Sequence, residues 1–163
     1  MDQEHPAGQV PESASGGATQ PQVSGATPAS ESESQSVFPP GLTARVELTV
    51  TDVDTAQAVG SGDVPVLGTP QVLALAEAAT VAATASRLPA GMTTVGMRVE
   101  LDHRMPTPVG RTAVAQARLA KVDGRRLLFE VAVTEGATTV AEGRVERMLV
   151  DRQRFLARAQ GTP

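Results

Sequence analysis

Residues 68–87 read GTPQVLALAEAATVAATASR, and this stretch predicts the one long helix around which the chain folds. Thr69 is a favoured N-cap residue, and Pro70 suits the first helical position, where its missing N–H costs no hydrogen bond. The residues that follow are almost all small or apolar, and Ala is the strongest helix former. A helix that is apolar nearly all round is normally buried, so we expect a sheet to wrap around it.

Glu77 is the only charged residue between Asp63 and Arg87. A carboxylate on a helix of neutral residues is costly to bury unless it has a partner or takes part in chemistry. The ordinary alternative is that Glu77 points to solvent beside Thr80 and Thr84, since buried acids are rare. The composition of the helix does not distinguish these two interpretations.

Composition excludes several classes of protein. The chain has 163 residues, which suits one domain, and with three Phe and no Trp or Tyr its core must consist of Val, Leu and Ala. The lack of Cys excludes disulfides, a thiolate metal site and a cysteine nucleophile. No apolar run reaches the roughly 18 residues of a membrane span, and no signal-peptide pattern is present. We therefore expect a cytoplasmic protein that does not contact membranes.

Charge divides the chain into two parts. Residues 1–38 contain five acids and no base, whereas the remainder has 13 acids against 14 bases, too balanced to indicate nucleic-acid binding. The first part is also rich in Ser, Gly, Gln and Pro, and it has too few apolar side chains to offset the entropy of ordering. We expect residues 1–38, which include His5, to form a disordered tail and residues 39–163 to form the folded domain.

Period-two alternation of apolar residues predicts the strands. The first contains Val46, Leu48 and Val50, and the others span residues 93–104, 111–122, 125–134 and 138–151. Asp123-Gly124 and Glu135-Gly136 are turn signals between the last three, and a short helix around residues 154–160 follows. One long central helix wrapped by a curved antiparallel sheet is an α+β arrangement, the hot-dog fold. Such sheets commonly pair across a dimer, which covers an edge strand, so we expect a homodimer.

Three polar residues are candidates for chemistry, although each has an ordinary explanation. His103 is the only His in the predicted domain, at the end of a strand and just before the turn Pro106-Thr-Pro-Val-Gly110. A lone His there is more often structural than catalytic, and Thr69 taken alone is more often a helix cap.

Together, Gly68-Thr69, Glu77, His103 and the following Pro-rich turn resemble the fluoroacetyl-CoA thioesterase family. The resemblance covers roughly residues 41–156 and includes the Val122-Asp-Gly-Arg-Arg126 turn and Glu146-Arg147. It implies that Thr69, Glu77 and His103 form the catalytic set. It also implies that Gly96 lines the acyl site and that Gly68 lies beside the substrate.

The implied reaction is hydrolysis of a short or medium acyl-CoA to free acid and CoA, with no cofactor and no metal. His103 can move protons, Glu77 can act as nucleophile or base, and Thr69 can donate a hydrogen bond or attack. The start of the long helix offers free N–H groups to an oxyanion. Whether Thr69 or Glu77 bonds to the acyl group, and which subunit supplies His103, stay open at this point.

Other features concern the substrate. The phosphates of CoA need cations, and we expect Arg125 and Arg147 to supply them, with Arg126 as ordinary surface. The family has an aromatic lid over the acyl group, whereas residues 55–68 here have Gly60, Gly62 and Asp63 and no Phe. We therefore expect no strong preference for a fluorinated acyl group, because a lost apolar contact is worth only about 1–3 kcal/mol.

Two alternative functions remain on the same fold. One is an acyl-CoA-binding regulatory module without turnover, which would not need Glu77 on a neutral helix. The other is a different reaction on acyl-CoA, such as hydration. Release of the CoA thiol distinguishes both from a thioesterase.

Overall fold

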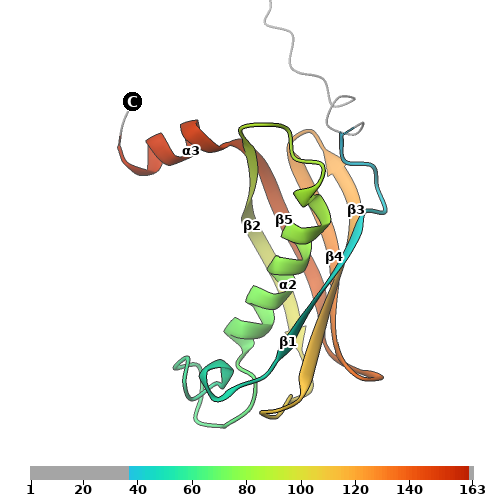
Figure 1. Ribbon diagram of the computed structural model, residues 1–163, viewed down its shortest axis with the longest axis vertical. Coiled ribbons are helices and arrows are strands. Elements are labelled where there is room, and N and C mark those ends of the chain that lie inside the picture. The colour runs from blue at the N-terminus through green and yellow to red at the C-terminus, as the bar shows by residue number, and fades with distance from the viewer. Residues whose placement is uncertain (1–36, 162–163) are drawn as a thin grey trace, which may run out of the picture.

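The computed structural model describes residues 37–161, in which one long helix lies against one face of a five-stranded antiparallel sheet (Figure 1). The strands are β1 (Thr43–Thr49), β2 (Met92–His103), β3 (Thr112–Asp123), β4 (Arg126–Glu135) and β5 (Thr138–Asp151). The helices are α2 (Thr69–Ala85) and α3 (Arg152–Ala159), with a short 3-10 turn at Asp52–Asp54. None of the helices in this part of the chain is long and apolar enough to span a membrane.

The sheet order is β1-β3-β4-β5-β2, so β1 and β2 are the two edges. The hairpins β3–β4 and β4–β5 turn at Gly124 and Gly136, where φ is +55° and +57°, a conformation that favours glycine. The predicted turn signals are therefore confirmed. β2 follows α2 in the chain but pairs with β5, so the helix passes across the sheet before the chain returns at the far edge.

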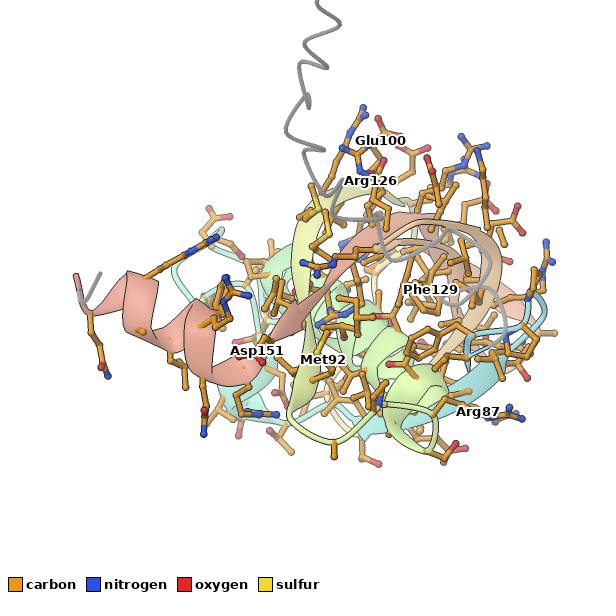
Figure 2. All side chains as sticks on the ribbon, turned by 90° about the horizontal axis from the view of Figure 1, so that it is seen from above. Arg87, Met92, Glu100, Arg126, Phe129 and Asp151 are labelled. Atoms are coloured by element: carbon orange, nitrogen blue, oxygen red, sulfur yellow. The ribbon has the colours of Figure 1, made fainter. Side chains whose placement is uncertain are left out.

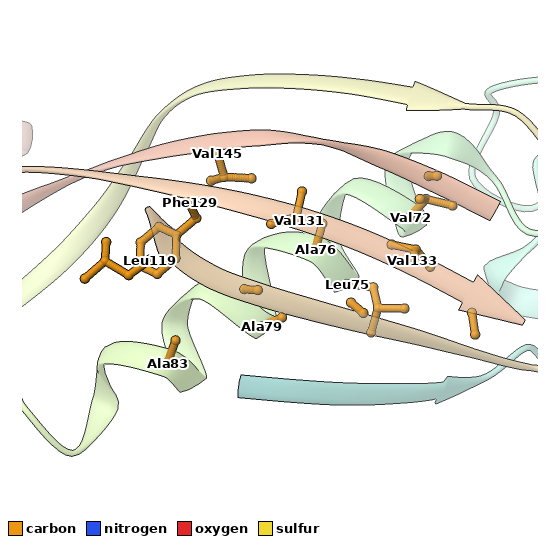
Figure 3. Close-up of a cluster of buried hydrophobic side chains, with 14 of the residues drawn as sticks. Val72, Leu75, Ala76, Ala79, Ala83, Leu119, Phe129, Val131, Val133 and Val145 are labelled. Atoms are coloured by element: carbon orange, nitrogen blue, oxygen red, sulfur yellow. The ribbon is translucent and has the colours of Figure 1, made fainter. Parts of the chain in front are cut away.

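The core fills the space between α2 and the sheet (Figure 3). Its helix side is mostly Ala, and its sheet side carries most of the larger residues. The helix contributes Val72, Leu75, Ala76, Ala79 and Ala83, and the sheet contributes Leu119, Phe129, Val131, Val133 and Val145. Thr80 and Thr84 are also fully buried, and their hydroxyls donate to the carbonyls of Glu77 (2.6 Å) and Val81 (3.0 Å). The alternative for Glu77 placed it at solvent beside these two threonines, but the threonines are buried and the Glu77 side chain is only 32% exposed.

The prediction that Thr69 is the N-cap is wrong by one position. Gly68 is the N-cap and Thr69 is the first helical residue, while the helix ends at Ala85 rather than Arg87. A Cβ on Gly68 would lie 2.9 Å from Cγ2 of Val59, so the preceding loop packs closely against this cap. Because Thr69 does not cap the helix, its hydroxyl is available for another partner.

The predicted alternation in β2 is also wrong over its first half, because the strand contains a β-bulge. Gly96 pairs with Arg147 and Arg98 pairs with Glu146, which leaves Met97 as an extra residue. Gly96 and His103 are an odd number of residues apart, so a regular strand would place them on opposite faces. The extra residue reverses the alternation within the strand, so Gly96 and His103 both face α2.

The folded unit begins earlier than the predicted boundary after residue 38. Phe38 is fully buried in the core, so it belongs to the domain rather than to the tail. Residues 1–36, which carry the rest of the predicted tail, lie outside the described residues.

Candidate active site

The side chains of Thr69 and His103 meet at the start of α2. Thr69 Oγ1 lies 2.9 Å from His103 Nδ1, and His103 Nε2 lies 3.1 Å from the carbonyl oxygen of Met105. A carbonyl oxygen can only accept, so Nε2 is the protonated nitrogen of the neutral ring and Nδ1 carries the lone pair. The Thr69 hydroxyl therefore donates to Nδ1, which is the geometry of an alcohol next to its general base.

Two backbone contacts hold this pair together. Leu67, just before the helix, donates its N–H to the carbonyl of Thr107 at 2.9 Å, and Val66 forms a bridge with Pro108. The turn that follows His103 is thus fastened to the segment that leads into Thr69. Within the described chain, the N–H groups of Gln71 and Val72 both bond to Gly68 O and that of Thr69 has no acceptor. One free N–H therefore lies at the positive end of the helix dipole.

Glu77 forms a second polar cluster with Arg147, about 12 Å along α2 from Thr69 at 1.5 Å per residue. Arg147 Nη1 donates to Glu77 Oε1 (3.3 Å) and to Thr80 Oγ1 (3.4 Å), while its other nitrogens donate to Oγ1 and O of Thr94, both at 3.0 Å. The Arg147 side chain is 7% exposed and that of Glu77 is 32% exposed. Burial lowers the pKa of Arg147, and the nearby Glu77 carboxylate opposes this shift.

Gly96 lies directly against the Glu77 carboxylate. A Cβ at Gly96 would overlap Glu77 Oε1, so only glycine leaves room for the carboxylate where it now lies. Among residues 37–161, the one side chain that donates to this carboxylate is Arg147.

The two expected phosphate ligands lie apart. Arg147 is buried with its donors engaged, so it belongs to the Glu77 cluster and not to a surface that meets phosphates. Arg125 is exposed at the β3–β4 turn and lines a hollow beside α3. Gly68 keeps the loop close to the helix start, next to Thr69.

Sequence reasoning missed the residues that hold these groups in place. Thr94 and Thr80 anchor Arg147, and neither has a distinctive sequence signal, since Thr94 follows Thr93 in a predicted strand and Thr80 lies on a helix of small residues. Asp54 anchors the loop before α2, since it accepts from N (2.8 Å) and Oγ1 (2.6 Å) of Thr51 and from Nε2 of Gln71 (3.1 Å). These hydrogen bonds, chiefly from the Thr51 hydroxyl, lower the pKa of Asp54.

The loop of residues 55–67 is fastened at both ends. Thr55 bridges Leu67, and Ala56 N donates to Val66 O at 2.8 Å. Its large exposed apolar residues are Val59 and Val64, which are 36% and 49% exposed. The loop beside the Thr69–His103 pair therefore offers small aliphatic groups and no aromatic ring.

Fold and site together define a class, that of hot-dog proteins with a polar site on the central helix, which includes thioester hydrolases. A hot-dog-like protein from Thermanaerovibrio acidaminovorans superposes with a TM-score of 0.72 over 78% of this chain and 94% of its own at 23% identity, which shows the fold. Residues 50–153 match the family described as fluoroacetyl-CoA-specific thioesterase, and the chain belongs to this family.

Individual relatives agree with this assignment. A fluoroacetyl-CoA thioesterase from Streptantibioticus cattleyicolor is 33% identical over 99 residues, which are 60% of this chain and 71% of the relative. A solved fluoroacetyl-CoA thioesterase superposes with a TM-score of 0.70 at 28% identity and covers 76% of this chain and 97% of its own. The predicted fold, family and thioester hydrolase class are confirmed.

Proposed function

We propose that this chain hydrolyses short or medium acyl-CoA thioesters to the free acid and CoA, without a strong preference for fluoroacetyl-CoA. The observation that carries the proposal is the hydrogen bond between Thr69 Oγ1 and His103 Nδ1 at the start of α2. A binding module has no need for a hydroxyl held against the basic nitrogen of a histidine. Membership of a thioesterase family supports the same conclusion.

The proposed reaction uses the lone pair of His103 Nδ1. This nitrogen takes the proton of the attacking hydroxyl, from Thr69 or from a water that Thr69 orients. The tetrahedral oxyanion that forms on the acyl carbon is stabilised by the N–H of Thr69 and the dipole of α2. As the carbon–sulfur bond breaks, the proton passes from Nδ1 to the sulfur, and CoA leaves as a neutral thiol. Attack by water gives the free acid in this step. Attack by Thr69 leaves an acyl ester, which a water then hydrolyses as Nδ1 takes the proton of the water and returns it to Thr69 Oγ1.

Glu77 is the third member of the proposed catalytic set, as nucleophile or as base for the hydrolytic water. Arg147 acts as its positioning residue, because its guanidinium is fixed by Thr94 and donates to the carboxylate. Gly96 leaves the space in which the carboxylate lies.

A homodimer with a shared site explains why Glu77 and His103 do not meet within one chain. β2 is an edge strand, and the exposed Met97 on it and Val81 on α2 are apolar. Antiparallel pairing of β2 with its copy about a two-fold axis reverses the strand. The Gly96 half of one β2 then lies beside the His103 half of the other. Glu77, which lies against Gly96, therefore approaches His103 of the partner subunit.

The weak fluoroacetyl preference rests on the loop of residues 55–67, which has only small aliphatic side chains beside the site. The test is CoA thiol release with acetyl-CoA, fluoroacetyl-CoA and medium-chain acyl-CoAs. We expect hydrolysis across the panel, with kcat/KM for fluoroacetyl-CoA and acetyl-CoA within about 100-fold, the scale of one or two apolar contacts. A ratio of many thousands would contradict the selectivity, and binding without thiol release would contradict the function.

A further inference from the structure

A separate hollow of about 290 Å³ opens where α3 leaves the sheet. Figure 2 shows Met92 and Asp151 side by side at this point, in agreement with their pairing between β2 and β5. Three arginines line the hollow, Arg125 from the β3–β4 turn and Arg154 and Arg158 from α3, together with Phe155. The hollow therefore joins a cationic surface to an exposed aromatic ring.

These arginines differ from several on the outer face of the sheet. There, Arg118 forms an ion pair with Glu130, and Arg104 forms one with Glu142. Within residues 37–161, no carboxylate lies within 4.0 Å of the guanidinium groups that line the hollow.

The only acid in the wall of the hollow is Asp151. Its carboxylate caps α3 by accepting from the backbone N–H of Arg154 at 2.8 Å. The hollow therefore keeps an excess of positive charge. A dianionic or polyanionic ligand would neutralise it.

Phe155 adds a second kind of contact. Phe155 is 43% exposed, and it is one of only three aromatic residues in this sequence. A nucleobase stacked on an aromatic ring gains about 1–3 kcal/mol, and guanidinium groups bind phosphate oxygens in pairs. The geometry points to a nucleotide that carries more than one phosphate. We propose that the hollow binds the 3′-phosphoadenosine diphosphate end of CoA, an assignment that rests on the proposed acyl-CoA substrate.

The position of the hollow agrees with this ligand. Met92 and Asp151 pair four residues along the same two strands from the pair Gly96 and Arg147. Four residues of strand correspond to about 13 Å. The long pantetheine arm of CoA can span this interval, with its thioester end near Glu77 and its nucleotide end beside α3.

The experiment measures CoA binding and acyl-CoA kinetics in a double variant, Arg154→Gln with Arg158→Gln. We expect the Kd for CoA in calorimetry and the KM for acetyl-CoA to rise about tenfold or more, the scale of lost hydrogen bonds between charged groups. The Kd for adenosine 3′,5′-bisphosphate, which measures the subsite without turnover, should rise equally. Acetyl-pantetheine lacks the nucleotide, so its hydrolysis should change far less.

The matched control is Arg152→Gln, which removes the same charge from the same helix but does not line the hollow. It should leave Kd and KM within about twofold, on the scale of a screened surface charge. Phe155→Leu keeps the apolar bulk and removes the ring, so it should weaken binding of the bisphosphate. The double variant Arg154→Lys with Arg158→Lys keeps the charge, so it should bind the bisphosphate more tightly than the glutamine double variant.

Two outcomes overturn the subsite. One is a double variant that binds CoA as tightly as the wild type, and the other is an equal loss in Arg152→Gln, which would indicate net charge only. If the bisphosphate binds through Arg154 and Arg158 but the wild type hydrolyses no acyl-CoA, the subsite stands and the proposed thioesterase function fails.

Discussion

At the scale of single residues, the site depends on where each polar group is held. Thr69 and His103 are 34 positions apart, and the sequence placed both in the catalytic set, but it also predicted Thr69 as the N-cap of the helix. The N-cap is Gly68, whose backbone is extended, and the preceding loop packs closely against it. The sequence does not predict the close packing at Gly68, since this packing depends on Val59 and Ala56 folding back against the helix start.

Removal of the Thr69 hydroxyl should separate chemistry from folding. Thr69→Val keeps the shape of the side chain but donates nothing to His103 Nδ1, so we expect kcat to fall at least about 100-fold. Thr69→Ser keeps the hydroxyl and should retain most of the activity. Thermal unfolding should show little change in either variant, because Thr69 is exposed. Equal activity in the valine and serine variants would contradict this role.

Gly96→Ala tests the contact with Glu77. The new methyl group must displace the carboxylate, the far end of a flexible side chain, so we expect kcat to fall about tenfold or more with a small change in Tm. In a Glu77→Gln background the same substitution should add little further loss, because the two changes disable one group. Additive losses in the double variant would show that Gly96 acts independently of Glu77.

At the scale of elements, the sequence predicted the helix, the strands and the turns because each has a strong local signal. The bulge in β2 was not predicted, since Val95 and Met97 continue a regular alternation of apolar residues. The pairing with β5 overrides that alternation, and it is the bulge that turns both Gly96 and His103 toward α2. The predicted end of the tail, after residue 38, is wrong for a related reason. Phe38 is a single buried residue next to a polar segment, so no periodic pattern marks it as part of the core.

Phe38 should be a determinant of stability. It is fully buried in the core, so Phe38→Ala should lower the free energy of unfolding by about 3–5 kcal/mol through lost burial and the cavity it leaves. Phe155→Ala is the matched control, since it removes the same ring from a half-exposed position on α3. Denaturant unfolding measures both, and a change below about 1 kcal/mol for Phe38→Ala would contradict the placement of this residue.

The loop before α2 should respond to acid through Asp54. Its pKa in the folded state lies below its ordinary value of about 3.9, so its stabilising contribution is present above that pH and is lost as the pH falls through the folded-state pKa. We expect Asp54→Asn to lower Tm at pH 7, with the difference from the wild type narrowing below about pH 4. Asp52→Asn changes an exposed neighbour and should show no such effect. A Tm difference between Asp54→Asn and the wild type that stays constant across this pH range would contradict a stabilising role of the Asp54 carboxylate.

At the scale of the whole molecule, one chain separates Thr69 and His103 from Glu77, and the proposed dimer about β2 would bring the two groups together. The sequence could name all three residues and the fold, because these follow from local patterns and from resemblance. It could not place Arg147, which was assigned to phosphate and is buried beside Glu77. Only the three-dimensional pairing of β2 with β5 brings Arg147 beneath α2.

Complementation between inactive variants tests the shared site. His103→Ala and Glu77→Gln, each inactive alone, are mixed in equal amounts, unfolded and refolded together. If one site takes Glu77 from one subunit and His103 from the other, half of the dimers are mixed and each has one intact site, so about a quarter of the wild-type activity returns. Recovery of no activity, with light scattering that confirms dimers, would place the whole site within one chain.

If Thr69, His103 and Glu77 together hydrolyse acyl-CoA, the reaction depends on each of them. The rate of CoA thiol release from acetyl-CoA by the wild type, His103→Ala and Glu77→Gln measures this dependence. We expect turnover by the wild type and a loss of at least about 100-fold in each variant, the scale of a lost acid–base group, with unchanged Tm. Thiol release at the wild-type rate by either variant would contradict its role in the site, and no release by the wild type would contradict the proposed function.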